Sequence, residues 1–445
     1  MKTQYFALIG EPAPTSTIQT MSPDALTYQE AAALVAKHAA RLASARLIEE
    51  RVKLARAAGR VLARPLHADR DQPPFARSTR DGYACRAAEA SLHGPLAVAG
   101  ATRAGAAPSG SLPGRSVWEI MTGAPVPRGA DAVVMLEHVE LADGYMRLLP
   151  PRTVAAGENV VARGAQARKG DELLPSGTTI GPAQIALAAA CGYATLQVFR
   201  KPRVAILATG DELVPVEKSP RPGQIRNSNA PMLAAMVAAA AGNPRVLPIA
   251  ADTEKALDTA LVKAADADLL LITGGVSAGK FDLVEPALAR AGAKFHFTGV
   301  RIQPGKPTVF GEIPRRRTKP VQSQNGAKHN KIGTKCFFGL PGNPVSSAVT
   351  FLLFVAPLLG ALAGRRETGP RFALAQLAAD VKVKPGLTRF LPAACMFDAS
   401  TPQVALVPWQ GSGDIAAMAR ANCFLVVPEA TDRLEAGAIV PILLS

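Results

Sequence analysis

The chain is poor in aromatic residues and in cysteine. Aromatic residues make up 5% and hydrophobic residues 48% of its 445 residues, so Ala, Val and Leu must supply most of the core of a globular protein. Its five cysteines lie far apart and form no C-x-x-C pair, which argues against a zinc site or a disulfide framework. We therefore expect reduced, mostly buried thiols.

Long apolar runs are missing as well. No run reaches the roughly 18 residues of a membrane-spanning helix, and the longest candidate, residues 349–362, is expected to form a buried helix. The N-terminus carries a short apolar run, residues 5–9, without a convincing cleavage site, so no secretory signal is expected. These absences predict a cytoplasmic protein that does not contact a membrane.

The Walker A loop, a common phosphate-binding pattern, is also absent. The six histidines are scattered without metal-ligand spacing, so a catalytic histidine is not expected. The chemistry must come from other residue types.

Positive charge is in excess and concentrated in one segment. The net charge is +15, and residues 313–335 hold seven cations and no acid. Such an excess favours an anionic partner, whether nucleic acid, a membrane surface or a phosphorylated small molecule. The segment is polar and reads more simply as a solvated insertion. Nucleic acid is the weaker choice, because we find neither a nucleic-acid fold motif nor interleaved aromatic residues.

The length of the chain requires several domains, because single cores stop growing at about 250–300 residues. We predict a multidomain α/β plus β protein with a mostly parallel central sheet. The expected domains are an elongated linking domain from residues 25–70 and 151–181, a small β-rich domain from 71–150, an α/β domain from 182–365 and a C-terminal β domain from 366–445.

Helix signals mark the first part of the chain. Thr27-Tyr28-Gln29-Glu30 has the S/T-x-x-E form of a capping box, and the Ala- and Leu-rich run after it predicts a helix. Residues 49–63 predict a second helix that ends near Pro65. Short apolar runs broken by Gly and Pro follow, which is typical of β structure.

Strands and helices alternate between residues 203 and 363. The expected strands are 204–208, 246–249 and 269–272, and the expected helices are 231–241 and 254–265. This order predicts right-handed βαβ units and a parallel sheet.

Polar turns follow three strands of this sheet. They are Thr209-Gly210-Asp211-Glu212, Thr273-Gly274-Gly275-Val276-Ser277 and Leu340-Pro341-Gly342-Asn343-Pro344. The carboxyl ends of strands in an open parallel sheet form the ligand crevice, and Pro/Gly turns can hold an oxyanion there. Each glycine turn taken singly is weak evidence for a ligand site, because tight connections between strands and helices often need glycine for conformational reasons alone.

Carboxylates accompany these turns. Glu212 follows the first strand, Asp252 the second, and Asp282 lies beyond the Gly-Gly turn. Carboxylates beside a phosphate-binding turn suit Mg²⁺, which takes oxygen ligands and bridges phosphates. Asp252 could instead cap the next helix.

The motifs, taken together and in order, resemble the molybdopterin molybdenumtransferase family, the bacterial MoeA proteins and the E domain of gephyrin. Besides the three turns, the matching pieces are Asp81-Gly82-Tyr83-Ala84, Met121-Thr122-Gly123-Ala124-Pro125, Gly157-Glu158-Asn159-Val160, Pro304-Gly305-Lys306-Pro307 and Gln410-Gly411-Ser412-Gly413. They span roughly residues 25 to 440.

The resemblance implies an enzyme that inserts molybdate into adenylylated molybdopterin and releases AMP with Mg²⁺. It implies a homodimer in which Asp81 and Thr122 face the partner subunit's α/β domain. By the same resemblance the catalytic residues are Asp81, Glu212, Asp282 and Lys306, with Glu212 and Asp282 as metal ligands. The implied substrate-binding residues are Thr122, Asp252, Gly274, Gly275, Ser277, Pro307, Pro341, Pro344, Ser346, Arg389 and Ser412.

The chain departs from the family pattern at a few positions. Arg77, Thr79 and Arg80 replace residues of the usual Asn-Ser-Ala-Met before Asp81, and Gln303 stands where many members have lysine. These changes keep a second hypothesis open, a molybdopterin-binding carrier or scaffold with reduced catalytic activity. Nucleic-acid binding through the basic segment is the third.

Overall fold

The computed structural model describes residues 25–105, 110–275, 283–315, 334–397 and 401–445. These residues fall into two compact units. The first contains the chain up to Glu50, Gly59–Ala63 and Gln197–Ser445, and the second contains Arg51–Ala58 and Arg64–Leu196. Residues 182–196, which the predicted division assigns to the α/β domain, group with the second unit; the four-domain division itself stays a prediction.

A six-stranded sheet organises the first unit. Its order is β16-β13-β17-β21-β20-β18, with the first four strands parallel and the last two pairings antiparallel. Its strands are β13 (Arg203–Ala208), β16 (Asn243–Val246), β17 (Leu269–Thr273), β18 (Lys294–Phe297), β20 (Val309–Pro314) and β21 (Thr334–Leu340). The predicted parallel sheet is therefore present, with antiparallel strands added at one edge.

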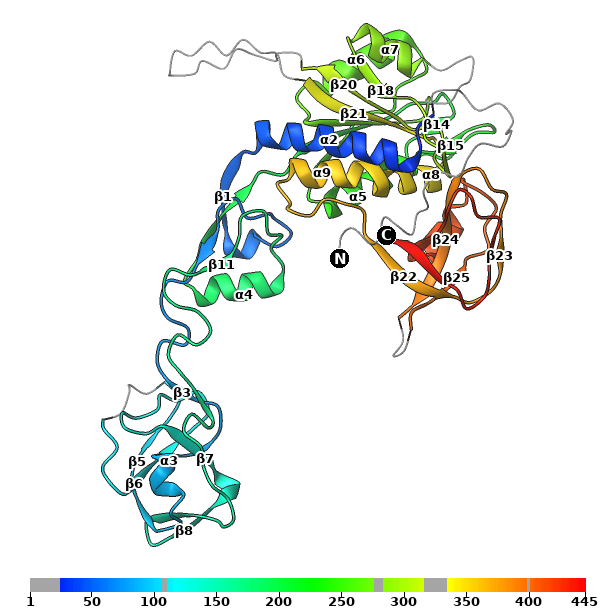
Figure 1. Ribbon diagram of the computed structural model, residues 1–445. Helices are drawn as coiled ribbons and strands as arrows, with labels where there is room; N and C mark the ends of the chain where they lie inside the picture. Colours follow the sequence, from blue (N-terminus) through cyan, green and yellow to red (C-terminus); the bar gives the residue numbers. More distant parts are fainter. Residues whose placement is uncertain (1–24, 106–109, 276–282, 316–333, 398–400) are drawn as a thin grey trace, which may run out of the picture. The chain divides into compact units, whose positions relative to one another are not determined.

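Helices cover both faces of this sheet because successive strand residues point to opposite sides. Val204 and Ile206 pack in one core, whereas Ala205 and Leu207 pack in another. The helices of the first face are α2 (Tyr28–Arg46), α5 (Asn229–Ala239), α8 (Pro344–Thr350) and α9 (Ala356–Leu362), and those of the second are α6 (Glu254–Lys263) and α7 (Val284–Arg290). Figure 1 shows α2 beside α9, with which it is in contact.

The capping box at the start of α2 is confirmed. The Thr27 hydroxyl accepts a hydrogen bond from the Glu30 N–H at 3.2 Å, and the Thr27 N–H donates to the Glu30 carboxylate at 2.8 Å. The local sequence thus determines where the helix begins.

The long apolar helix is longer than predicted. It runs from α8 through a π-helical turn (Phe351–Val355) into α9, so Pro344–Leu362 is one helical segment of 19 residues. Its length and composition match those of a membrane-spanning helix, but 78% of its most apolar window is buried inside the protein. It packs in the first core with α2, which is the role that the sequence predicts for residues 349–362.

A second sheet follows in the same unit, in the order β19-β24-β25-β22-β28-β26. The last strand, β26, also pairs with β24, so five of the strands form a closed ring of pairings. Its strands are β19 (Ile302–Gln303), β22 (Phe372–Leu377), β24 (Thr388–Met396), β25 (Gln403–Leu406), β26 (Cys423–Val427) and β28 (Ile439–Leu444). The remaining elements of this region are β23 (Val381–Lys382), α10 (Ile415–Arg420) and β27 (Arg433–Leu434). The C-terminal region is thus a β domain.

The second unit contains another six-stranded sheet, in the order β7-β4-β6-β5-β9-β8. Its strands are β4 (Gly82–Cys85), β5 (Leu96–Thr102), β6 (Ser116–Ile120), β7 (Ala132–Met135), β8 (Val139–Ala142) and β9 (Tyr145–Leu148). The unit also holds β2 (Leu66–His67), β3 (Arg77–Ser78), α3 (Ala87–Ala90), β10 (Val160–Val161), β11 (Glu172–Leu174) and α4 (Pro182–Ala190).

All five cysteines of the chain are free and buried, as predicted.

The prediction of a helix over residues 49–63 is wrong. The segment forms β1 (Glu49–Lys53) and one 3₁₀ turn (Leu54–Arg56), and Gly59 takes a φ of 71°. Its backbone bonds to distant residues, since Leu54 N–H donates to Ala194 O and Ala63 N–H donates to Gln197 O. Long-range pairing therefore overrides the helix propensity of its Ala, Leu and Arg residues.

Candidate functional site

Three turns meet at the carboxyl edge of the parallel strands. Ala208 is in register with Thr273, and Thr273 with Leu340, so β13, β17 and β21 end side by side. Thr209 N–H donates to Thr273 O at 3.1 Å, which joins the first turn to the second. The parallel sheet thus brings together segments that are more than a hundred residues apart in the chain.

Gly274 lets the first two turns approach closely. Its φ is 91°, and a Cβ placed on it would lie 2.3 Å from Thr209 O. No other residue type fits without moving backbone, because that distance is well below van der Waals contact. Gly275 follows in the same turn with a φ of 60°. Ser277 and Asp282 lie outside the described residues.

A chain of hydrogen bonds orders the acidic residues. The Thr209 hydroxyl donates to Asp252 Oδ1 at 2.6 Å, and the Asp252 N–H donates to Asp211 Oδ1 at 3.1 Å. Asp252 does not cap α6, because Thr253 is the N-cap and accepts from the Ala256 N–H. The Asp252 carboxylate is exposed and oriented by the Thr209 hydroxyl.

Glu212 lies over the first turn. A Cβ on Gly210 would lie 2.5 Å from the Glu212 carboxylate, so this glycine leaves the space that the carboxylate occupies. Glu212 itself is exposed. Its carboxylate is therefore open to a cation or to a substrate.

The described carboxylates at this edge do not converge as a group of three. The metal-ligand cluster found among the described residues lies elsewhere in the unit. Mg²⁺ commonly takes one or two carboxylates and completes its shell with water and substrate phosphates. Exposed oxygen donors such as Glu212 fit that mode of binding, whereas a cage made only of these protein side chains does not.

Asn229 is a site residue that the sequence analysis missed. Its Nδ2 donates to Thr273 Oγ1 at 2.8 Å and to Gly342 O at 2.7 Å, which ties the second turn to the third. A carbonyl oxygen only accepts, so the contact with Gly342 sets the orientation of the amide. The Oδ1 atom is buried without a partner in the described structure. Asn227-Ser228-Asn229 resembles a helix start, which hides this longer-range contact.

Ser412 joins the third turn from the C-terminal domain. Asn343 Nδ2 donates to Ser412 Oγ at 2.8 Å, and the Val345 N–H donates to Ser412 O at 3.1 Å. Pro341 O accepts from the Ser347 hydroxyl at 2.5 Å, and Pro344 is the first residue of α8. Ser412 therefore lies beside the third turn, and its role in binding substrate stays a prediction.

Ser346 differs from Ser412 in accessibility. It is only 4% exposed, inside the first turn of α8, and its carbonyl accepts from the Thr350 hydroxyl. The structure therefore buries this serine rather than presenting its hydroxyl to solvent.

Lys306, Pro307 and Arg389 lie around the junction of β19 with β24. Gln303 is in register with Arg389, and the Lys306 side chain is exposed while its carbonyl accepts from the Val300 N–H. The Arg389 guanidinium donates to Lys384 O, and burial lowers the pKa of Arg389. Two cations are thus presented by neighbouring segments, while Gln303 contributes none.

The remaining predicted residues lie in the second unit. The Thr122 N–H donates to Asp81 Oδ1 at 2.7 Å, and both residues are exposed. The structure brings these two together as one local cluster. Their position opposite a partner subunit stays a prediction.

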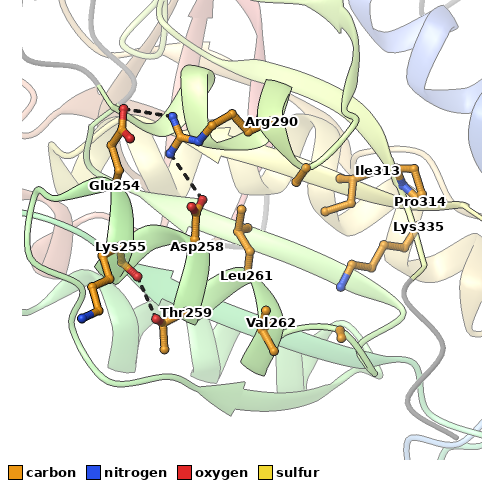
Figure 2. Close-up of a pocket in the computed structure, with 12 residues that line it drawn as sticks. Glu254, Lys255, Asp258, Thr259, Leu261, Val262, Arg290, Ile313, Pro314 and Lys335 are labelled. Atoms are coloured by element: carbon orange, nitrogen blue, oxygen red, sulfur yellow. Dashed lines mark hydrogen bonds and ion pairs between the residues drawn. The ribbon is translucent and has the colours of Figure 1, made fainter.

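A separate pocket of about 620 Å³ lies beside α6 and α7 (Figure 2). Arg290 bridges Glu254 and Asp258 at its rim, and Lys335 lies at its other side. Burial lowers the pKa of Lys335 to about 8, and its ammonium donates to Ala264 O. None of the described predicted site residues lines this pocket, so its size does not make it the candidate site.

Three family models match the chain in order. The MoeA N-terminal region (domain I and II) matches residues 26–192, a probable molybdopterin binding domain matches 205–361, and the MoeA C-terminal region (domain IV) matches 374–445. The second of these spans the three strand-end turns.

Named relatives and solved structures agree with these matches. The molybdopterin molybdenumtransferase of Nostoc sp. is 37% identical over 71% of this chain and 70% of its own length, and that of Bacillus subtilis is 34% identical over 86% and 87%. The crystal structure of the molybdopterin biosynthesis moeA protein from Pyrococcus horikoshii OT3 matches with a TM-score of 0.75 and 28% identity. It covers 95% of this chain and 100% of that one.

Proposed function

Because the chain belongs to the MoeA family of molybdopterin molybdenumtransferases, we propose that it inserts molybdate into adenylylated molybdopterin and releases AMP with Mg²⁺. It acts in molybdenum cofactor biosynthesis, and molybdopterin is the substrate that its central domain binds. The observation that supports the proposed reaction is that three polar turns meet at one edge of the sheet, inside the region matched by the molybdopterin-binding family model.

The turns act as a preorganised support for the pterin phosphate. Asn229 joins the second and third turns, and Thr209 joins the first and second. Groups fixed in this way stabilise charge without a reorganisation cost when the substrate binds. Gly274 and Gly275 keep the surface free of side chains.

Molybdate is the second substrate in this proposal. It is a tetrahedral oxyanion, and Lys306, Arg389 and the Ser412 hydroxyl offer two positive charges and a hydrogen bond to such an anion. Pro307, Pro341 and Pro344 restrict the backbone around them, because proline holds φ near −65°. When the dithiolene sulfurs bond to molybdenum, an oxygen displaced from molybdate would leave as water with the two thiol protons.

Mg²⁺ is the proposed metal cofactor, with Glu212 and Asp282 as its protein ligands. When bound it would neutralise charge on the phosphate that separates as AMP. Glu212 offers an exposed carboxylate for this role, and Asp252 is oriented for the phosphate region by its bond from Thr209.

Asp81 and Thr122 complete the proposed site in a homodimer. Each subunit would present this pair to the partner subunit's α/β domain, so that activity requires the dimer. A cytoplasmic location and the absence of a nucleic-acid role stay predictions, and most of the basic segment lies outside the described residues.

AMP release tests the proposal directly. Purified protein would be incubated with adenylylated molybdopterin, Mg²⁺ and molybdate, and AMP measured over time for wild type, Glu212→Gln and Asp282→Ala. Glu217→Gln is the matched control, because Glu217 is an exposed carboxylate in the loop after β14 (Leu213–Val214). We expect molybdate-dependent AMP release that both site variants reduce at least about 100-fold and the control leaves unchanged.

A different result would favour the carrier. Tight binding of the pterin by wild type without any release of AMP would contradict insertion and support the binding-only hypothesis.

A further inference from the structure

Two histidines and a glutamate meet at the edge of the first unit. His38 comes from α2, His296 from β18 and Glu312 from β20. One ligand atom from each lies within 4.8 Å of the other two. His38 and His296 are 258 positions apart in the sequence, so no short metal-binding motif contains both of them.

The distances suit coordination of one metal ion. His38 Nδ1 lies 3.2 Å from Glu312 Oε1, and His296 Nε2 lies 4.0 Å from Glu312 Oε2. Two donors on a tetrahedral zinc ion are about 3.4 Å apart, given metal–ligand distances near 2.1 Å. The first pair, which is a hydrogen bond in this structure, is close to that separation, and the second pair, which involves the other carboxylate oxygen, needs a small side-chain shift.

The His296 ring supplies the second observation. Its side chain is 9% exposed, and Nε2 is buried without a hydrogen-bond partner in the described structure. A buried polar atom left unpaired is costly, so it needs an explanation. The same nitrogen is the donor atom that points toward Glu312.

The surroundings keep the two rings in place. The ring centroids of His38 and His296 are 4.0 Å apart, and both rings pack against Phe310. Glu312 is 11% exposed and lies 3.9 Å from the Cys336 thiol through Oε1. The site is thus held by packing from three elements, as a preorganised ligand set requires.

We propose that His38, His296 and Glu312 form a binding site for Zn²⁺ that links α2 to the strand pair β18–β20. Two imidazoles and one carboxylate are a known zinc ligand set with a fourth position left for water. The site lies apart from the three turns, since Glu312 is in register with Cys336, near the start of β21, while the third turn begins at the end of that strand, at Leu340. It is therefore independent of the proposed molybdate insertion.

Arg41 competes with the metal. Its guanidinium pairs with Glu312 Oε1, but its side chain is 54% exposed, so it can move into solvent when a metal ion takes over the neutralisation of the buried Glu312 carboxylate. Glu312 Oε1 contacts His38, Arg41 and the Cys336 thiol, whereas Oε2 lies 4.0 Å from His296 Nε2, so Oε2 is the oxygen that we assign to the metal. Removing Arg41 should therefore strengthen zinc binding, whereas in a purely polar cluster it would only remove an ion pair.

Zinc titration of tag-free, chelator-treated full-length protein tests the site. Wild type, His296→Asn, Glu312→Gln and Arg41→Met would be compared by isothermal titration calorimetry, with Mg²⁺ as the hard-cation control. His67→Gln is the matched variant, because His67 is an exposed histidine in the second unit. Cobalt(II) absorption would report the coordination geometry.

We expect one zinc ion per wild-type chain. His296→Asn and Glu312→Gln should weaken its binding by more than about 10-fold, the lower end of what loss of a supporting group costs a metal site. Arg41→Met should tighten binding and His67→Gln should leave it unchanged. The cobalt spectrum should show the strong visible bands of four-coordinate geometry.

Two results would overturn the proposal. One is the lack of a stoichiometric zinc site in wild type, which would leave an ordinary polar cluster. The other is zinc binding that Glu312→Gln does not weaken, which would place the ion elsewhere. Circular dichroism of each metal-free variant controls for folding, and if His296→Asn does not fold, Glu312→Gln alone decides.

Discussion

The two ends of the parallel strands in the first unit carry polar groups of different kinds. At the amino end, Asp268 accepts hydrogen bonds from Arg200 at 3.0 Å, from Arg315 at 2.7 Å and from the Arg203 N–H at 2.9 Å. At the carboxyl end, Glu212 and Asp252 remain exposed. Charges that are saturated by partners stabilise the fold, whereas charges left open beside turns are available to a ligand.

The most strongly shifted pKa among the described lysines of the first unit does not mark the candidate site. Lys335 has a strongly lowered pKa and lies at the amino end, in the pocket of Figure 2, rather than among the three turns. Structural burial perturbs ionisation as effectively as a catalytic environment does. Here the topology of the strands identifies the candidate site better than electrostatics does.

The largest expected effect is at the amino end. Asp268→Ala would leave three arginines without their shared carboxylate and should lower the free energy of unfolding at pH 7 by about 4 kcal/mol. Urea unfolding measures this. Asp258→Ala, which breaks an exposed pair with Arg290, should cost less than about 1 kcal/mol, and equal losses would contradict the distinction.

The same carboxylate has a pH signature. Burial alone would raise the pKa of Asp268, but hydrogen bonds from Arg203, Arg315 and Arg200 outweigh burial and lower it. Its stabilising contribution is therefore full above the unfolded pKa near 3.8 and is lost as the pH falls through the lower folded pKa. Asp268→Ala should lack this part of the acid transition.

Gly274→Ala would test the carboxyl end. The new methyl group would meet Thr209 O, and the positive φ adds strain, so the free energy of unfolding should fall by about 3–4 kcal/mol. AMP release should be lost as the first two turns separate. Gly342→Ala is the control, because its Cβ would have its nearest contact at 3.7 Å, and its effect should stay within about 0.5 kcal/mol.

Lys335→Met would test the buried cation. The folded pKa near 8 lies below the ordinary 10.5, so the folded state disfavours the charged amine below pH 8 and this penalty fades as the pH rises toward 10.5. The free energy of unfolding of the wild type, measured relative to that of Lys335→Met, should therefore rise by about 3 kcal/mol as the pH goes from about 8 to 10.5. The comparison needs unfolding curves at several pH values, with exposed Lys263→Met as the control. A flat difference would show that Lys335 titrates normally.

The smallest expected effect is at Asn229. Asn229→Ala would remove the two hydrogen bonds that join the second and third turns, at a cost of about 2 kcal/mol. Binding of molybdopterin should weaken more than folding does, because the turns lose their mutual orientation. Exposed Asn243→Ala should change neither quantity, and parallel losses in binding and stability would argue for a purely structural role.

Local patterns were enough to predict much of the α/β domain. The strand at β17 and the helices α5 and α6 lie within a few residues of their predicted limits, because their alternating apolar runs are short-range features. The strand predicted over residues 246–249 instead ends at Val246, as β16. Pro248 has no N–H to continue the pairing.

In the candidate site, too, local features could be predicted from the sequence and long-range contacts could not. The three turns could be found from the sequence because each follows its own strand. Asn229 could not, since its helix-start pattern says nothing of contacts with Thr273 and Gly342. The region around Ser277 and Asp282 stays a prediction.

The sequence by itself determined the order of strands and turns, the capping box at Thr27 and the family to which the chain belongs, because these depend on residues near one another or on ordered motifs. Only the tertiary structure decided that residues 49–53 pair as a strand, that Ser346 is buried, and that His38 meets His296 and Glu312. Each of these depends on contacts between distant segments, whose free energy outweighs local preference and which no spacing in the chain records.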